Sequence, residues 1–120
     1  MEVKVDRLGT IIVLSLEGDI DIVSAAQLRE QFDQLLAHAT PKLLVDLAGV
    51  QYIDSYGLGI IMQAVKVARR EGGDLRLCAP RPNVRTLLDV TGFSKHMSII
   101  SSRSIALMSW SREKSASPPA

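Results

Sequence analysis

The sequence has few aromatic residues and very little cysteine or histidine, and each shortage excludes a kind of protein. Aromatic side chains make up 4% of the 120 residues, so the core must be mainly aliphatic, and 47% of the residues are hydrophobic. The single cysteine, Cys78, excludes an internal disulfide and a cysteine-based zinc cluster. Two histidines, His38 and His96, are too few for a metal site. We therefore expect neither a metal nor a cofactor.

Long apolar runs and a charge excess are also missing. No apolar run approaches the roughly 20 residues that a membrane-spanning helix needs, and the first residues lack the apolar stretch of a signal peptide. The formal net charge of +1 argues against a large surface for nucleic acid. These absences predict a cytoplasmic domain that neither binds nucleic acid nor inserts into a membrane.

Hydrophobic periodicity predicts strands and helices that alternate along the chain. We expect strands at 3–5, 10–16, 42–47, 74–79 and 97–100, the first two forming a hairpin. Helices are expected after residue 24, up to residue 71, around 84–88 and over 102–112. This order predicts an α/β fold, a mixed sheet of about five strands with about four helices packed on it. One domain should cover residues 1–112, and residues 113–120 should form a disordered tail.

Two of the helices carry specific signals. Ser24 and Gln27 have the spacing of a capping box, in which each side chain satisfies a free backbone amide of the other residue. This pair predicts that Ser24 caps the first helix. The inward-facing side chains of that helix are predicted to be Leu28, Phe32, Leu35 and Leu36. Those of the terminal helix are predicted to be Ile105, Met108 and Trp110.

Two short motifs precede the first two helices. Gly18-Asp19-Ile20-Asp21 is predicted to be a loop before the first helix. Asp54-Ser55-Tyr56-Gly57-Leu58-Gly59 follows a buried strand and opens the second helix. With this order of elements, residues 1–110 resemble the STAS domain, and most of all the stand-alone anti-sigma-factor antagonists of bacteria. The resemblance implies a STAS-type mixed sheet.

The resemblance also implies a function in transcription regulation by partner switching. Ser55, directly after the aspartate of the second motif, corresponds to the phosphoacceptor. The implied partner is an anti-sigma factor that is also a serine kinase and binds the ATP. It holds the unphosphorylated antagonist and releases the phosphorylated one, which a separate phosphatase resets. The partner-binding residues implied in this way are Asp19, Asp21, Asp54, Tyr56, Gly57, Leu58 and Gly59.

Each motif residue also has a purely structural interpretation. Ser55 and Asp54 are both residues that cap helices, and a phosphate on Ser55 would be tolerated by the helix N-terminus. Asp19 and Asp21 are equally typical of a turn. The glycines of the second motif would allow strained dihedrals and close approach to the backbone.

Enzymatic chemistry is not indicated by the sequence. Gly57 and Gly59 hint at a dinucleotide-binding loop, but Met62 stands where that motif needs its third glycine. No phosphate-binding G-x-x-x-x-G-K-[ST] motif occurs, so this chain should not itself be an ATPase. No nucleophile and base are paired in the sequence, and we predict that the protein is not an enzyme.

Tyr56 departs from the pattern of the family, in which a small residue usually follows the acceptor serine. A large side chain at this position could alter the docking of a kinase. It therefore favours an alternative function, a STAS adaptor subunit that regulates a membrane transporter or a signalling scaffold without being phosphorylated.

Overall fold

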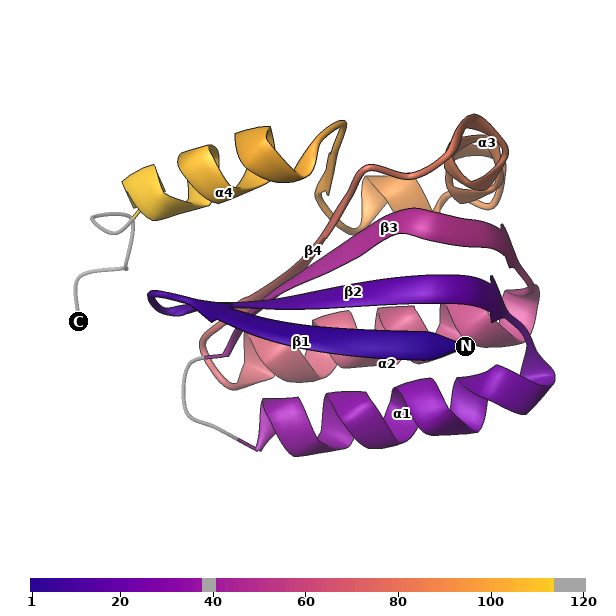
Figure 1. Ribbon diagram of the computed structural model, residues 1–120, viewed down its shortest axis with the longest axis horizontal. Helices are drawn as coiled ribbons and strands as arrows, with labels where there is room; N and C mark the ends of the chain where they lie inside the picture. The colour runs from indigo at the N-terminus through magenta and orange to yellow at the C-terminus, as the bar shows by residue number, and fades with distance from the viewer. Residues whose placement is uncertain (38–40, 114–120) are drawn as a thin grey trace.

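The computed structural model describes residues 1–37 and 41–113, in which strands and helices alternate after an opening hairpin (Figure 1). The strands are β1 (Glu2–Leu8), β2 (Ile11–Ile20), β3 (Lys42–Ile53), β4 (Asp74–Cys78) and β5 (Ile99–Ile100). The helices are α1 (Ile22–Leu36), α2 (Ser55–Arg70), α3 (Pro82–Val90), α4 (Arg103–Arg112) and a 3₁₀ turn, η1 (Phe93–Lys95). The predicted order of elements is confirmed.

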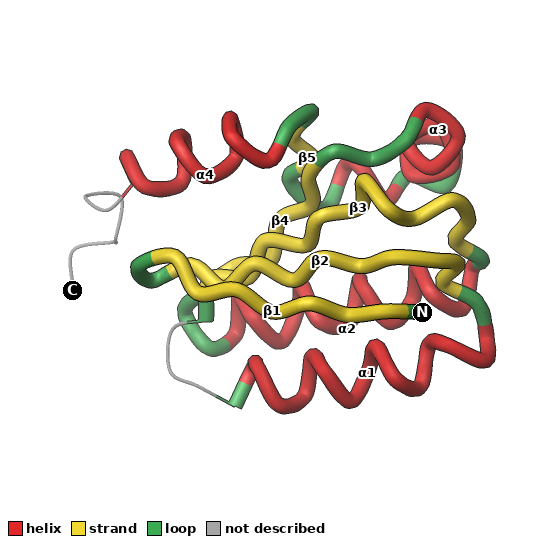
Figure 2. The backbone as a smooth tube through the Cα atoms, in the orientation of Figure 1, coloured by secondary structure: helices red, strands yellow, loops and turns green. Residues whose placement is uncertain are grey.

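The strands form one mixed sheet in the order β1-β2-β3-β4-β5 (Figure 2). β1 pairs with β2 in the antiparallel direction, and the other neighbouring strands are parallel. β3 is the central strand, and its residues Leu43, Leu44 and Val45 are all buried, as a strand covered on both faces requires. The predicted α/β fold with a mixed sheet is confirmed.

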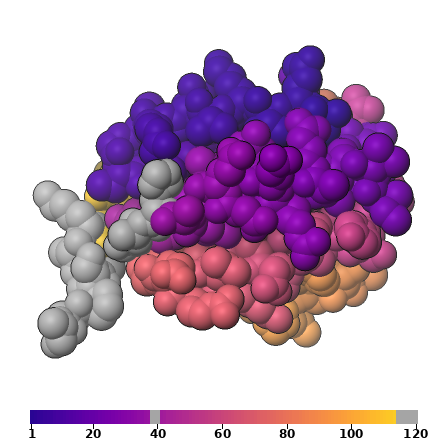
Figure 3. Space-filling view, turned by 90° about the horizontal axis from the view of Figure 1, so that it is seen from below, coloured from indigo at the N-terminus to yellow at the C-terminus, as the bar shows by residue number. Residues whose placement is uncertain are grey.

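Helices cover the two faces of the sheet unequally. α1 and α2 lie side by side against one face (Figure 1) and form the middle of the surface seen in Figure 3. The main core lies between these helices and the sheet, where Phe32 is the largest buried side chain. α4 lies on the opposite face and covers a smaller apolar cluster. That cluster consists of Ile11, Val13, Leu44, Cys78, Ala106 and Trp110.

The inward face of α4 differs from the prediction. Trp110 is buried as expected, but it shares its face with Ala106, four residues earlier and one turn away. Ile105 and Met108 are 54% and 57% exposed, so their predicted inward orientation was wrong. Ala106 and Trp110 define the inward face of α4, and Ile105 and Met108 lie off that face.

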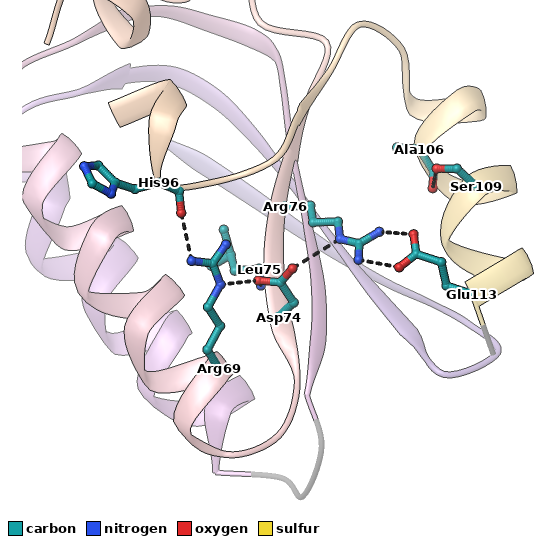
Figure 4. A network of polar contacts seen from close by, with 8 residues as sticks. All are labelled: Arg69, Asp74, Leu75, Arg76, His96, Ala106, Ser109 and Glu113. Atoms are coloured by element: carbon teal, nitrogen blue, oxygen red, sulfur yellow. Dashed lines mark hydrogen bonds and ion pairs between the residues drawn. The ribbon is translucent and has the colours of Figure 1, made fainter. Parts of the chain in front are cut away.

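A chain of charged side chains fixes the C-terminal end of α4 (Figure 4). Both terminal nitrogens of Arg76 donate to the Glu113 carboxylate, at 2.7 and 2.8 Å. Its guanidinium also lies 4.2 Å from the ring centre of Trp110, and its Nε donates to Asp74. Glu113, placed by the sequence in the tail, is thus the C-cap residue of α4. The rest of the predicted tail lies outside the described residues.

Three strands extend further than predicted, and β1 covers Glu2–Leu8 where residues 3–5 were expected. β2 continues to Ile20, so the stretch expected to be a loop is largely strand, and β3 continues to Ile53. Parallel pairing of Gly18 with Val50 and of Ile20 with Ile53 explains the difference, because each polar stretch gains a hydrogen-bonded neighbour. No helix in the described ranges is long and apolar enough to cross a membrane.

Candidate functional site

The two sequence motifs meet at the carboxyl ends of the neighbouring strands β2 and β3. Ile20 and Ile53 are paired at the ends of β2 and β3. The backbone N–H of Asp54 donates to the carbonyl oxygen of Ile20 at 3.0 Å, which joins the two strand-to-helix junctions. Asp21 and Asp54 therefore begin neighbouring helices from neighbouring strands. Residues more than 30 positions apart in the chain form one surface region, at the right-hand end of the sheet in Figure 1.

Asp21, and not Ser24, caps α1. Its Oδ1 accepts hydrogen bonds from the backbone N–H of Val23 at 3.0 Å and of Ser24 at 2.9 Å. The Ser24 hydroxyl in turn accepts from the Asp21 N–H at 2.9 Å, which completes a capping box. The predicted box of Ser24 with Gln27 was wrong, since the helix begins two residues before Ser24. The hydrogen bond from the Ser24 backbone is the main cause that lowers the pKa of Asp21.

Asp54 caps α2 and leaves Ser55 free. The Asp54 Oδ1 accepts from the backbone N–H of Gly57 at 2.8 Å. Ser55 is the first residue of the helix and is exposed. Within the described ranges its hydroxyl makes no side-chain hydrogen bond, so the cap role belongs to Asp54 alone. An anion at this position would face the positive end of the helix dipole.

The two glycines of the second motif have different surroundings. A Cβ on Gly57 would lie 2.6 Å from Cγ2 of Ile20, a separation too short for real atoms. A Cβ on Gly59 would meet no atom within 4 Å. Both lie within α2 and neither has a positive φ, so the expected strained dihedrals are absent at these two positions. The missing side chain of Gly57 allows α2 to pack closely against the end of β2. The missing side chain of Gly59 leaves the surface of α2 uncovered at that position.

The remaining predicted partner-binding residues divide by exposure. Asp19 and Tyr56 are exposed, whereas Asp21 and Asp54 are half-buried by their roles as caps. Leu58 is 1% exposed and packs in the main core, and Gly57 is buried as well. The surface open to a partner thus contains Asp19, Ser55, Tyr56 and Gly59, and the buried residues of the motif support it from beneath.

Sequence reasoning named Tyr56 but missed three other exposed apolar side chains at the two junctions, those of Ile22, Val23 and Tyr52. Ile22 and Val23 follow the Asp21 cap, and Val23 is 82% exposed. Tyr52 and Tyr56 flank Asp54 and Ser55, and Tyr56 is 50% exposed. We call Ile22, Val23, Tyr52 and Tyr56 the apolar junction residues. For Ile22 and Val23 the available signal was the presence of apolar residues in the first turn of α1, directly after the Asp21 cap, whereas Tyr52 is the next-to-last residue of β3. Grouped exposed apolar residues are typical of interaction surfaces.

The polar groups of the region are a few carboxylates and hydroxyls. Within residues 1–37 and 41–113, no group of three or more histidine, cysteine, aspartate or glutamate side chains could hold a metal ion. The carboxylates of Asp21 and Asp54 are occupied by backbone amides. Ser55, Tyr52 and Tyr56 are the exposed hydroxyl-bearing residues of the region.

Comparisons with known proteins agree with this architecture. A sequence profile of the STAS domain matches residues 2–106. The anti-sigma-B factor antagonist of Bacillus subtilis is 36% identical over 81 residues, which cover 68% of this chain and 73% of the relative. The anti-sigma F factor antagonist of Paenibacillus polymyxa is 27% identical over 100 residues, which cover 82% of this chain and 86% of the relative. The crystal structure of an anti-sigma factor antagonist from Mycobacterium paratuberculosis superposes with a TM-score of 0.82 at 27% identity, covering 90% of this chain and 92% of that one.

Proposed function

The chain belongs to the STAS domain family, and from this premise we propose that it is a cytoplasmic anti-sigma-factor antagonist controlled at Ser55. In this proposal it binds an anti-sigma factor that is also a serine kinase, and phosphorylation of Ser55 releases it. One observation carries the choice of residue: Ser55 is exposed at the first position of α2, while Asp54 caps the helix. The names of the relatives support the choice of partner.

The chemical step requires little from this chain. The Ser55 oxygen attacks the γ-phosphorus of ATP, the bond from that phosphorus to ADP breaks, and the hydroxyl proton passes to a base of the kinase. ATP and its metal ions are held by the partner. A separate phosphatase would restore the hydroxyl by hydrolysis. The protein is thus a substrate and a ligand, and not the enzyme.

Phosphorylation should act on the surface and leave the fold unchanged. A phosphate adds about −1.5 to −2 charge at pH 7, and the N-terminus of α2 accommodates that charge. The apolar junction residues lie at the two strand-to-helix junctions, which the bond from Asp54 to Ile20 joins, and Ser55 follows Asp54 at one of them. A partner docked on them would have to strip water from the phosphate, which is costly without a compensating partner. Asp19 and Asp54 add negative charge nearby and would repel an acidic partner surface.

The test is affinity capture from a lysate of the source organism. The baits are wild type, Ser55→Ala, Ser55→Asp and Ser104→Asp, followed by mass spectrometry of the captured proteins and of Ser55 itself. Ser104 is a matched control because it is an exposed serine in the first turn of another helix, α4. We expect wild type, Ser55→Ala and Ser104→Asp to retain an ATP-binding anti-sigma factor, Ser55→Asp to lose it, and phosphate to appear on Ser55.

The alternative, an adaptor that is not phosphorylated, rests on Tyr56. This large and half-exposed side chain lies directly beside Ser55 and would narrow the approach of a kinase. Capture of the same transporter or scaffold subunit by all four baits, with Ser55 unmodified, would establish the adaptor and refute the switch. Large backbone shifts by NMR in the phosphorylated protein would refute the surface mechanism alone.

A further inference from the structure

The second half of β3, the strand that leads to Ser55, has a neighbouring strand on one side only within the described residues. β3 extends from Lys42 to Ile53, but β4 pairs only with its first part, as far as Asp46. From Leu47 onward, the edge of β3 that faces away from β2 has no strand beside it in the part of the chain that the structure describes. Backbone carbonyls on such an edge need other donors.

The pairing of β3 with β2 is also irregular in this stretch. Ser15 is paired with Asp46, but the next paired residues are Glu17 and Gly49, so β3 carries one extra residue there. A second shift follows, because Gly18 pairs with Val50 and Ile20 pairs with Ile53. Each shift is a bulge that interrupts the ladder locally. Two bulges thus fall between the regular part of β3 and the serine.

Side chains from the start of α3 reach both bulges. The Nε of Arg81 donates to the carbonyl oxygen of Ala48 at 3.0 Å, and Ala48 lies within the first bulge. The Nδ2 of Asn83 donates to the carbonyl oxygen of Gln51 at 2.6 Å, within the second bulge. These two donors replace the amides that a neighbouring strand would supply.

The start of α3 is itself held firmly. Val84 and Leu88 on its inner face are buried in the main core. Pro82 occupies the first helical position, where its fixed φ suits the helix. Arg81 is the N-cap residue, but its side chain makes no capping bond and extends to β3 instead. The side chains of Arg81 and Asn83 therefore extend from the start of a helix that is packed against the main core.

We propose that Arg81 and Asn83 are positioning residues for the phosphoacceptor segment. By holding the two bulges they fix the last residues of β3, and with them Asp54 and Ser55, relative to the neighbouring junction at Ile20. This role rests on the proposed function, in which the segment is a kinase substrate. Neither residue contacts Ser55, so both act through the backbone of β3.

The first arm of the test needs no partner. Asn83→Asp keeps the size of the side chain but removes its donor, and a carboxylate in the first turn favours α3 itself. Amide hydrogen exchange is measured by NMR at Asp54, whose N–H donates to Ile20, and at Val45 in the regular part of β3. We expect exchange at Asp54 to become about fivefold faster, since one net hydrogen bond is lost, and exchange at Val45 to stay unchanged.

Arg81→Met should accelerate exchange at Asp54 in the same direction. Arg85→Met is the matched control, because Arg85 lies on the same helix and pairs with Asp89 of α3, away from β3. Equal exchange at Asp54 in wild type and Asn83→Asp would overturn the positioning role, whether or not Ser55 is ever phosphorylated.

The second arm uses the kinase recovered by affinity capture, with ATP. We expect kcat/KM for Ser55 phosphorylation to fall about fivefold in Asn83→Asp and to stay at the wild-type value in Arg85→Met, at a temperature where all variants are folded. Unchanged kcat/KM in Asn83→Asp would overturn the role, because a purely structural contact leaves the folded substrate intact. Absence of phosphate on wild-type Ser55 counts against the proposed function and leaves the exchange result standing.

Discussion

Gly57 and Gly59, two residues apart near the start of α2, should respond in opposite ways to alanine. Gly57→Ala places a methyl group 2.6 Å from Ile20 Cγ2, and such overpacking costs about 1–3 kcal/mol. Gly59→Ala enters open space and should raise the free energy of unfolding by about 0.5–1 kcal/mol through helix propensity. Urea unfolding of both variants measures these changes. Equal effects at the two positions would contradict the close approach of α2 to β2.

The carboxylate of Asp54 should stabilise the start of α2. Asp54→Ala removes the acceptor for the Gly57 amide, and loss of an N-cap typically costs about 1 kcal/mol. Asp19→Ala is the control, because Asp19 is exposed and its carboxylate caps no helix. Thermal unfolding should separate the two variants by a few degrees. If they unfold together, the Asp54 cap contributes nothing to stability.

At the scale of elements, the ion pair between Arg76 and Glu113 should make α4 sensitive to acid. Hydrogen bonds from Arg76 are the main cause that lowers the pKa of Glu113. Because the pKa of Glu113 is lowered in the folded state, its ion pair stabilises the protein at pH values above the ordinary glutamate pKa of about 4.3. This stabilisation is lost as the pH falls through the pKa of the folded state. We expect Glu113→Gln to be less stable than wild type at pH 7, and the difference to vanish at pH values below the folded pKa.

The control for this prediction is another charged pair. Asp89→Asn removes the partner of Arg85 in an exposed pair within α3, a contact worth only about 0.2–0.5 kcal/mol. Its effect at neutral pH should be small. A Glu113→Gln difference that persists at low pH would mean that α4 is held by packing and not by the ion pair.

Sequence patterns predicted the elements and their order but not their ends. Asp21 and Ser24 are both good capping residues, and the choice depends on β2 continuing to Ile20. That continuation comes from pairing with β3, a contact between distant parts of the chain. Ile105 and Met108 were predicted to face inward, whereas Ala106 and Trp110 define the inward face of α4.

Only part of the candidate site could be predicted from the sequence, because its other contacts join distant parts of the chain. Asp54 and Ser55 could be located from the motif, because a strand, an aspartate and a glycine-rich helix start are local features. The burial of Leu58 and the contacts of Arg81 and Asn83 with β3 could not be found from local spacing. They depend on which parts of the chain meet in the folded molecule.

For the whole molecule, Cys78 provides a measure of global opening. It is the one cysteine of the chain and lies beneath α4. Burial is the main cause that raises the pKa of its thiol to about 12. A disulfide reagent at pH 8 should therefore label the native protein slowly and the urea-unfolded protein at once, because only the thiolate reacts. Rapid labelling of the native protein would show that α4 detaches readily.

The placement of the two ends of the described chain decides how the protein can be fused or immobilised. A Cβ on Gly18 would lie 3.4 Å from the Cα of Met1, so the first residue lies beside the strand end that leads to Asp21. Glu113 pairs with Arg76, which lies beside Leu44 in the first part of β3, toward the opposite end of the sheet (Figure 1). An affinity tag ahead of Met1 would crowd the surface around Ser55. A fusion made directly after Glu113 begins at the far end of the sheet from that surface.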